Sequence, residues 1–337
     1  MLGIDKKIKE ITGCSADDIP EKIQKSTEPL ILRGLVAHWP IVQAGSKSVR
    51  HAADYLTQFY HNKPVTAAVG APENNGRIFY NDDLSGFNYQ SHSTNLNSLL
   101  DKICHHQNDS APPTIYVAST IVDTWLPGFR EANDITLNDP TPLVSIWMGN
   151  RSRIGAHYDL PDNMACNVVG RRRFTLFPPE QLANLYSGPI DLAPGGVPIS
   201  LVDFHQPDFV KFPKFRQALA AAQVAELEPG DAIFIPSMWW HHVESLDAFN
   251  VLVNYWWRQS PSYMSTPMDT LYHGLLTIRD LPPEQKRVWQ GIFEHYVFNT
   301  HAQTSVHIPK KSQGFLAPVD EDMARKLRAL LLNKLNR

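Results

Sequence analysis

The sequence predicts a mainly β protein with helical segments at both ends of the chain. Between about Val65 and Phe177, short apolar runs alternate with turn signals such as APENNG, NDDLSG and NDPTP, which is typical of antiparallel strands in a barrel or sandwich. Two further runs, DAIFIPSMWWHHV and NVLVNYWW, read as strands and complete the β region near Arg258. Apolar residues at helical spacing before and after this region predict the flanking helices.

The amino-acid composition indicates the size of the core, the kinds of partner and the cellular location to expect. The 337 residues are 43% hydrophobic, enough to bury a large core in one large domain or two. Lys and Arg number 31 against 34 Asp and Glu, so no overall field favours nucleic acid or an anionic membrane. Cys14, Cys104 and Cys166 form no Cys-x-x-Cys pair, which favours a reducing, cytoplasmic location over a disulfide framework. No signal peptide and no run of about 18 apolar residues is recognisable, so no membrane association is expected.

The first part of the chain carries two helical patterns, around Asp5 to Lys25 and Ser48 to Tyr60. The segment PLILRGLVAHWP between them is an apolar run closed by proline, which predicts a buried strand. Pro178 to Val224 is rich in Pro, Gly and Asp, yet it carries aromatic residues that a disordered linker does not need. We therefore expect an ordered insertion that lies on the barrel. Its aromatic residues include Phe204, Phe209, Phe212 and Phe215.

The tail after Arg258 changes to helical periodicity, and two amphipathic helices are expected in it. The first stripe comprises Trp289, Ile292, Phe293, Tyr296 and Val297, and the second comprises Met323, Leu327, Leu330 and Leu331. The predicted organisation is a β domain over residues 1–258 with N-terminal helices, followed by a helical segment over residues 259–337.

The stretch GAHYD holds the first candidate metal ligands. His157 and Asp159 stand at positions i and i+2, so in a strand both side chains lie on one face. An imidazole and a carboxylate are two thirds of the facial triad that holds non-haem Fe(II) and leaves further coordination positions open. A pair of this kind is more often two hydrogen-bonded polar residues, so the hypothesis needs a third ligand.

The stretch WWHHVES offers two neighbouring histidines as that ligand. Strand alternation places His241 on the same face as Val243, and His242 on the same face as Glu244. The apolar neighbour predicts that His241 points inward and ligates the metal. We expect His242 to be exposed or at the rim.

Three successive arginines in GRRRFTLF provide a candidate anion site. Arg172 shares a face with Phe174, whereas Arg171 and Arg173 share the other face, so Arg172 is the inward residue. A buried guanidinium is costly without an anion, which is either a bound ligand or a carboxylate of the protein itself. The residues alone leave both alternatives open.

Six segments, in order, carry a family resemblance. PLILRGLVAHWP, SIWMGNRSRIGAHYDLPDN, GRRRFTLFPPEQLANLY, VDFHQPDFVKFPKF, EPGDAIFIPSMWWHHVES and VLVNYWW are similar to the cupin-like JmjC hydroxylases, from about Pro29 to Arg258. The likeness is greatest to the asparaginyl hydroxylases of that family, the factor-inhibiting-HIF type. The resemblance implies a double-stranded β-helix (jelly roll of the cupin, JmjC type). It also implies an Fe(II)- and 2-oxoglutarate-dependent dioxygenase that uses O2 to hydroxylate or demethylate a substrate.

The resemblance assigns roles by position. His157, Asp159 and His241 match the family's iron ligands, and Arg172 stands where the similar hydroxylases have a lysine that binds the far carboxylate of 2-oxoglutarate. Arginine can make that contact bidentately. The remaining positions that match residues lining the cosubstrate pocket are Tyr116, Asn163 and Asn254. Ile154 departs from the pattern, because a threonine that contacts the cosubstrate stands there in the similar hydroxylases.

The function favoured by the sequence is hydroxylation of a substrate C–H bond, with a protein or peptide side chain expected by analogy. The alternatives are a cupin that binds a ligand or partner without 2-oxoglutarate turnover, or another metal-dependent cupin. The loops from Ala71 to Phe87 and from Pro189 to Phe215 would select the substrate. The tail helices resemble in placement those through which such hydroxylases dimerise, although their stripes could equally pack on the protein's own barrel.

Overall fold

A computed structural model describes residues 2–138, 141–299 and 301–336 of the chain. The chain divides into two compact units, Met1–Gln259 and Ser260–Arg337. The first unit contains every strand of the described residues, arranged in two sheets, and is the mainly β domain that the sequence predicts.

The larger sheet has nine strands in the spatial order β1-β2-β12-β9-β14-β7-β6-β3-β5. Along the chain these strands are β1 (Lys9–Ile11), β2 (Leu30–Leu32), β3 (Val65–Gly70), β5 (Tyr89–Thr94), β6 (Thr114–Ile121), β7 (Leu143–Gly149), β9 (Asp162–Val169), β12 (Ala232–Ile235) and β14 (Asn250–Trp257). All pairs within this sheet are antiparallel except β1 with β2.

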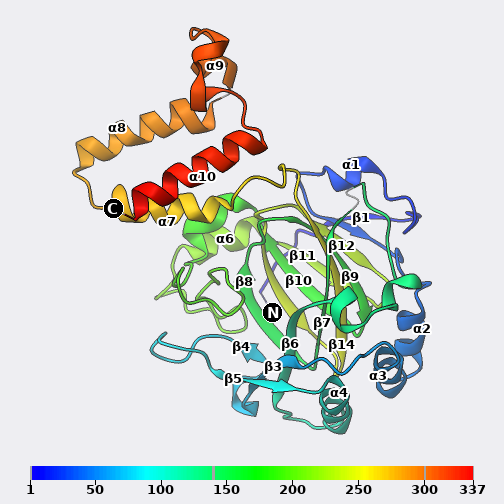
Figure 1. The fold of residues 1–337 in the computed structure, drawn as a ribbon. Helices are drawn as coiled ribbons and strands as arrows, with labels where there is room; N and C mark the ends of the chain where they lie inside the picture. Colours follow the sequence, from blue (N-terminus) through cyan, green and yellow to red (C-terminus); the bar gives the residue numbers. More distant parts are fainter. Residues whose placement is uncertain (1, 139–140, 300, 337) are drawn as a thin grey trace. The chain divides into compact units, whose positions relative to one another are not determined.

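The smaller sheet has five strands in the order β11-β10-β13-β8-β4. Its strands are β4 (Arg77–Ile78), β8 (Ser152–His157), β10 (Arg172–Phe177), β11 (Gln223–Leu227) and β13 (Trp240–Ser245). The two sheets stack face to face (Figure 1), and a buried apolar cluster lies between them. Phe174 and Val243 of the smaller sheet pack there with Ile233 and Leu252 of the larger one. This is the double-stranded β-helix of the cupins, as predicted.

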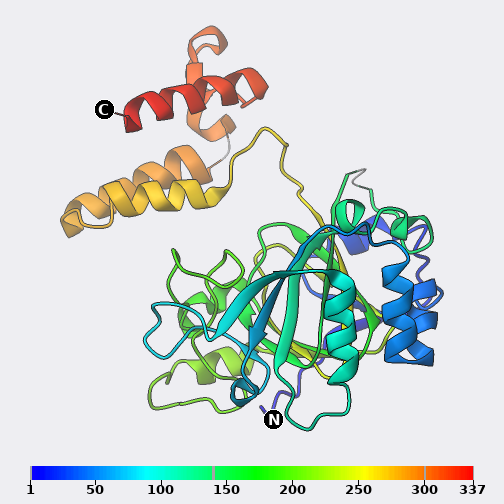
Figure 2. The ribbon, with the colours of Figure 1, turned by 60° about the horizontal axis from the view of Figure 1, so that its bottom comes forward.

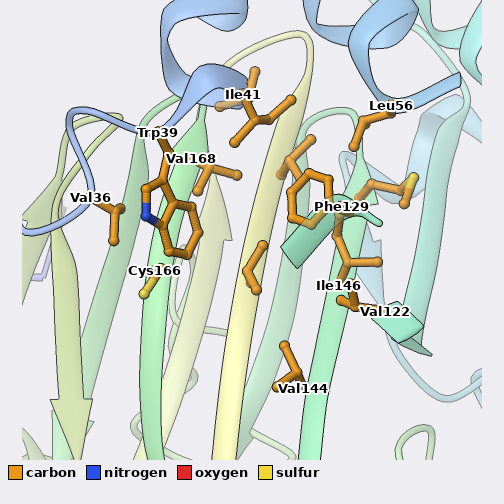
Figure 3. Packing of buried hydrophobic residues seen from close by; sticks show 14 of the residues in the cluster. Val36, Trp39, Ile41, Leu56, Val122, Phe129, Val144, Ile146, Cys166 and Val168 are labelled. Carbon is orange, nitrogen blue, oxygen red and sulfur yellow. The ribbon is translucent and has the colours of Figure 1, made fainter. Parts of the chain in front are cut away.

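Helices and loops cover the outer face of the larger sheet. The helices on this face are α1 (Glu21–Gln24), α2 (Pro40–Lys47), α3 (Val49–Thr57), α4 (Leu96–His105) and α5 (Val122–Trp125), whereas α6 (Phe215–Ala221) belongs to the insertion on the smaller sheet. In Figure 3, Ile41 and Leu56 from the helices and Trp39 beside them project toward Val168 and Ile146 of the sheet. Burial of this apolar surface fixes the N-terminal segments on the domain.

The insertion from Pro178 to Val224 covers the outer face of the smaller sheet and is ordered, as predicted. Phe204 and Phe215 are buried against Phe177 and Trp240 of the sheet, while Phe209 and Phe212 are partly buried. The ring centroids of Phe204 and Phe177 lie 5.6 Å apart in an edge-to-face arrangement. The barrel therefore has protein on both of its outer faces.

The prediction of the first N-terminal helix is wrong. Asp5 to Lys25 forms the short strand β1, a turn and the four-residue helix α1. Gly13 adopts a left-handed φ of +75°, which ends any helix there, and β1 gains a partner in β2. The second predicted helix is confirmed as α3, whose N-cap Ser48 accepts a hydrogen bond from the His51 amide.

The predicted strand DAIFIPSMWWHHV is two strands in different sheets. Pro236 follows β12 and lacks a ladder donor, and Met238 has a left-handed φ of +68°. The chain turns at these residues and crosses from the larger sheet to the smaller one. β13 therefore begins at Trp240, immediately before the histidine pair.

The second unit is helical, and both predicted amphipathic helices are present in it. Its helices are α7 (Pro267–Thr277), α8 (Pro283–Phe293), which continues as a π-helical segment (Glu294–Phe298), α9 (His301–Ser305) and α10 (Glu321–Leu335). Figure 2 shows them in chain order from α7 in yellow to α10 in red. Among the described residues, no helix combines the length and apolar character needed to span a bilayer.

Candidate metal centre

The structure brings His157, Asp159 and His241 together in the barrel interior. His157 is the last residue of β8 and lies directly opposite His241 of β13 in the antiparallel ladder. Asp159 follows two residues after His157. One potential ligand atom from each side chain lies within 4.8 Å of those from the other two. The Nε2 atom of His241 is 3.7 Å from Oδ2 of Asp159, so the donors converge on one point.

Backbone carbonyls orient both imidazoles. Nδ1 of His157 donates a hydrogen bond to the Gly155 oxygen at 2.9 Å, and Nδ1 of His241 donates to the Trp239 oxygen at 3.0 Å. A carbonyl only accepts, so each ring carries its proton on Nδ1 and presents the Nε2 lone pair to the cluster. Burial, together with the nearby His157, lowers the pKa of His241 to about 4, which keeps this imidazole neutral. Neutral imidazoles with free Nε2 atoms are suited to metal ligation.

Two asparagines connect the carboxylate to the larger sheet. Nδ2 of Asn163 donates to Oδ2 of Asp159 at 3.2 Å, and Nδ2 of Asn254 donates to Oδ1 of Asn163 at 2.7 Å. The amide of Met238 also donates to the backbone oxygen of Asp159 at 2.9 Å. Asn163 thus fixes the position of Asp159, and Asn254 fixes that of Asn163. The sequence did not predict these hydrogen bonds.

Arg172 lies in the same interior, as strand alternation predicted. Its side chain is buried, with 4% of the residue exposed, and its Nε has no hydrogen-bond partner. Within the described residues no carboxylate forms an ion pair with it, whereas Arg171 pairs with Asp247 and Arg173 with Glu226. Burial lowers the pKa of Arg172 to about 10, with the nearby Tyr116 opposing the shift, so the group remains charged at neutral pH. The internal ion pair that the sequence left open is therefore not seen in the described part of the chain.

All seven site residues predicted from the sequence line one interior cavity. Its lining comprises Tyr116, Trp147, Ile154, His157, Asp159, Asn163, Arg172, Phe174, His241, Val243, Leu252, Asn254 and Trp256. Four buried polar atoms in this lining have no partner: Nε of Arg172, Nε1 of Trp147, Nε1 of Trp256 and Oδ1 of Asn254. Orphaned buried polar groups are rare in folded proteins and indicate a missing ligand or water. Three of the four are donors, which suits an anion.

Trp147 and Trp256 are the lining residues with donors that the sequence reasoning missed. Trp256 stands two residues after Asn254 on β14, so alternation places both side chains on one face. Trp147 of β7 pairs in register with Leu252, again on that face. Strand alternation, which places Arg172 inward, also places both tryptophans on the inner face.

Tyr116 and Ile154 close one side of the cavity. The ring centroid of Tyr116 is 6.1 Å from that of Trp147, and burial raises the pKa of its phenol, which therefore stays protonated and able to donate. Ile154 and Val243 pair across β8 and β13 and contribute only apolar surface. The hydroxyl donor expected at position 154 in the similar hydroxylases has no counterpart on this side chain.

The prediction for His242 is wrong, because the residue is buried rather than at the rim. It is 5% exposed, its ring centroid is 4.5 Å from that of Phe204, and neither ring nitrogen has a hydrogen-bond partner. Burial lowers its pKa to about 4. Alternation correctly placed His242 on the outer face of β13, but the insertion covers that face.

Two sheets that enclose a His-x-Asp and a distant His define a cupin with a candidate facial triad. The chain belongs to the family of proteins with a cupin-like domain, since that family's model matches residues 16–263. This range contains every strand of both sheets except β1, and the whole candidate centre.

Curated relatives share this region at low identity. The chain is 26% identical to lysine-specific demethylase JMJ31 of Arabidopsis thaliana over 290 residues, which cover 77% of the chain and 51% of the relative. It is 25% identical to tRNA wybutosine-synthesizing protein 5 of Mus musculus over 319 residues, which cover 83% of the chain and 91% of the relative. It is 27% identical to lysine-specific demethylase 8 of Danio rerio over 270 residues, 76% of the chain and 60% of the relative. The match thus spans about half the length of the Arabidopsis relative and most of the mouse one.

Proposed function

We propose that the protein is an Fe(II)- and 2-oxoglutarate-dependent oxygenase that hydroxylates a C–H bond of its substrate. The main support for this proposal is the buried Arg172. It has no carboxylate partner in the described chain and lines the same cavity as the three candidate ligands. A three-ligand cluster alone suits many metal-dependent reactions. A buried cation beside it favours a cosubstrate that carries an anionic group away from the metal.

The residues of the chain fit such a cofactor set. His157, Asp159 and His241 would hold Fe(II), and Asn163 would keep Asp159 in place through its hydrogen bond. Arg172 would receive the far carboxylate of 2-oxoglutarate, with the phenol of Tyr116 as a further donor nearby. When bound, Fe(II), 2-oxoglutarate and O2 supply oxidative decarboxylation to succinate and CO2, with one oxygen atom passing to the substrate C–H bond. The apolar walls of Ile154, Phe174 and Leu252 exclude water from this chemistry.

A succinate assay tests the proposal. The protein is titrated anaerobically with Fe(II) and 2-oxoglutarate, exposed to O2, and scored for succinate. We expect the wild type to form succinate above the level of His157→Ala, because the variant lacks one of the three metal ligands. Equal succinate from both proteins under every substrate mixture would favour a cupin that binds without turnover. The likeness to asparaginyl hydroxylases motivates including peptide substrates in those mixtures.

We also propose that the helical unit mediates a homodimer. Helices α7 and α8 bury no residue of their own, and apolar side chains of the unit are exposed, including Leu271, Trp289 and Leu331. Apolar surface of this kind is typical of an interface between subunits. Light scattering should give twice the chain mass for the wild type and a lower mass for Leu331→Glu. The control Val210→Glu, at a position 93% exposed in the insertion, should stay dimeric. A monomeric wild type at all concentrations would contradict the proposal.

A further inference from the structure

The two loops that the sequence indicated as substrate-selecting line a pocket of about 770 Å³. It is lined by residues between positions 73 and 88 in the first loop, by residues between positions 201 and 212 in the second, and by Arg153 of β8. None of these lining residues lines the candidate metal cavity. A ligand held in this pocket is therefore distinct from the group that would react at the metal.

Two arginines of this pocket share one carboxylate. Arg77 of β4 and Arg153 of β8 are partners in the parallel ladder, so both side chains lie on the same face of the smaller sheet. Nη1 of Arg153 donates to Oδ1 of Asp203 at 3.1 Å, and Nη1 of Arg77 lies 3.4 Å from Oδ2 of the same carboxylate. The backbone amide of His205 also donates to Oδ1. One carboxylate thus serves two guanidiniums, and one positive charge remains in excess.

Arg77 is the less satisfied of the two arginines. Arg153 donates hydrogen bonds through Nε, Nη1 and Nη2, whereas Nη2 of Arg77 is buried and has no partner within the described residues. The guanidinium carbon of Arg77 lies 3.6 Å from the centroid of the Phe79 ring, which fixes the plane of the group. Burial lowers the pKa of Arg77, with Asp203 opposing the shift and Arg153 adding to it. A buried cationic donor without a partner indicates a missing acceptor.

The remaining charged groups of the lining are exposed. Lys211 adds a cation whose ammonium lies 5.3 Å from the Phe212 ring centroid, and Glu73 and Asp82 add two carboxylates. Salt screens exposed charges much more than partly buried ones, so these three groups act weakly on a ligand. His205 is engaged in an ion pair with Glu244. The partly buried groups therefore decide the preference of the pocket, and their net charge is positive.

We propose that this pocket binds a phosphate group, with Arg77 as its main contact and Arg153 and Lys211 as further cations. This inference goes beyond the proposed function and does not depend on it. Guanidinium groups match phosphate oxygens bidentately, and a phosphate oxygen would satisfy the unpartnered Nη2 of Arg77. A phosphate dianion gains more from several cations than a carboxylate of single charge does. Pockets for small molecules typically measure roughly 300–1,000 Å³, so there is room for the molecule that carries the phosphate.

Calorimetric titration of the full chain with inorganic phosphate tests the inference. We expect the wild type to bind phosphate and Arg77→Met to bind it on the order of tenfold more weakly, because a hydrogen bond between charged groups is lost. Arg216→Met is the matched control. Arg216 also lies over a phenyl ring, 4.0 Å from the Phe209 centroid, but it does not line the pocket, so its variant should bind phosphate like the wild type.

Two further variants locate the bound phosphate. Arg172→Met removes the other buried arginine that lacks an ion-pair partner in the described chain, and it should retain the phosphate affinity of the wild type. Lys211→Gln changes an exposed side chain that folding does not require, and it should weaken phosphate binding several-fold. This variant decides the outcome if Arg77→Met fails to fold.

Three ligands identify what carries the phosphate. Inorganic phosphate, adenosine 5′-monophosphate and the N-acetyl N-methylamide of phosphoserine are compared, and the one that binds most tightly shows whether the phosphate is free, on a nucleotide or on a protein side chain. Acetate should bind more weakly than all three.

A wild type that does not bind phosphate overturns the inference. So does acetate that binds as tightly as phosphate, since the pocket then has no preference for the dianion. Phosphate affinity that is lost in Arg172→Met and kept in Arg77→Met would place the anion in the metal cavity and would also overturn it. If Arg77→Met does not fold, unchanged phosphate affinity in Lys211→Gln has the same consequence.

Discussion

His241→Ala is expected to abolish Fe(II) binding and succinate formation, whereas His242→Leu should leave both intact. The two residues are adjacent, yet only the first presents a free Nε2 to the cavity beside His157 and Asp159. Loss of an outer-shell partner already costs a metal site ~10–100-fold in affinity, and loss of a ligand should cost more. Anaerobic titration with Fe(II), followed by calorimetry or by an optical charge-transfer band with 2-oxoglutarate, measures the effect.

The second variant serves as a matched control for folding. His242 is as buried as His241, so a general loss of packing would affect both variants. Leucine removes two ring nitrogens that have no hydrogen-bond partner and keeps a similar volume, so the free energy of unfolding should not fall. Metal affinity lost equally in both variants would show that the effect is structural and would contradict the assignment of His241.

Strand alternation explains why so much of the candidate site could be predicted from the sequence. Within a strand the inward and outward faces follow from apolar neighbours alone, and this rule separated His241 from His242 and Arg172 from Arg171. Local patterns suffice because Arg172, His241 and His242 lie in the strands β10 and β13. That β8, β10 and β13 converge on one interior was predicted from the family resemblance, because local residue patterns do not indicate it.

The errors arise where distant segments decide the outcome. The burial of His242 depends on Phe204, which approaches it only through the packing of the insertion. The break between β12 and β13 depends on Met238 adopting a left-handed φ, which no propensity indicates. Contacts of this kind are set by tertiary packing, which overrides local preference. The hydrogen bond from Asn163 to Asp159 is similarly a property of the assembled barrel.

Arg172→Ala is expected to weaken 2-oxoglutarate binding on the order of 10²-fold or more while metal affinity changes little. Truncating one partner of a buried charge pair costs about 2–5 kcal/mol, and Arg172 is the one arginine in the lining of the cavity. Arg172→Lys should retain part of the affinity, because it keeps the charge but loses the bidentate geometry. Titration of the Mn(II)-loaded protein with 2-oxoglutarate measures the affinity, and a separate Mn(II) titration measures the metal site.

The neighbouring arginines provide the controls, since the same substitution removes the same charge from the outer face. Arg171→Ala breaks an exposed pair with Asp247, and Arg173→Ala breaks the pair with Glu226 and the 3.7 Å contact with Glu244. Neither arginine lines the cavity, so both variants should bind 2-oxoglutarate like the wild type. Thermal unfolding without cosubstrate gives an independent readout: Arg172→Met should unfold at a higher temperature than the wild type, because it removes a buried charge that lacks a partner in the described chain. Added 2-oxoglutarate should then stabilise the wild type and not the variant. If Arg172→Met is less stable than the wild type, this arginine has a structural partner. If the variant also still gains stability from 2-oxoglutarate, another group binds the cosubstrate.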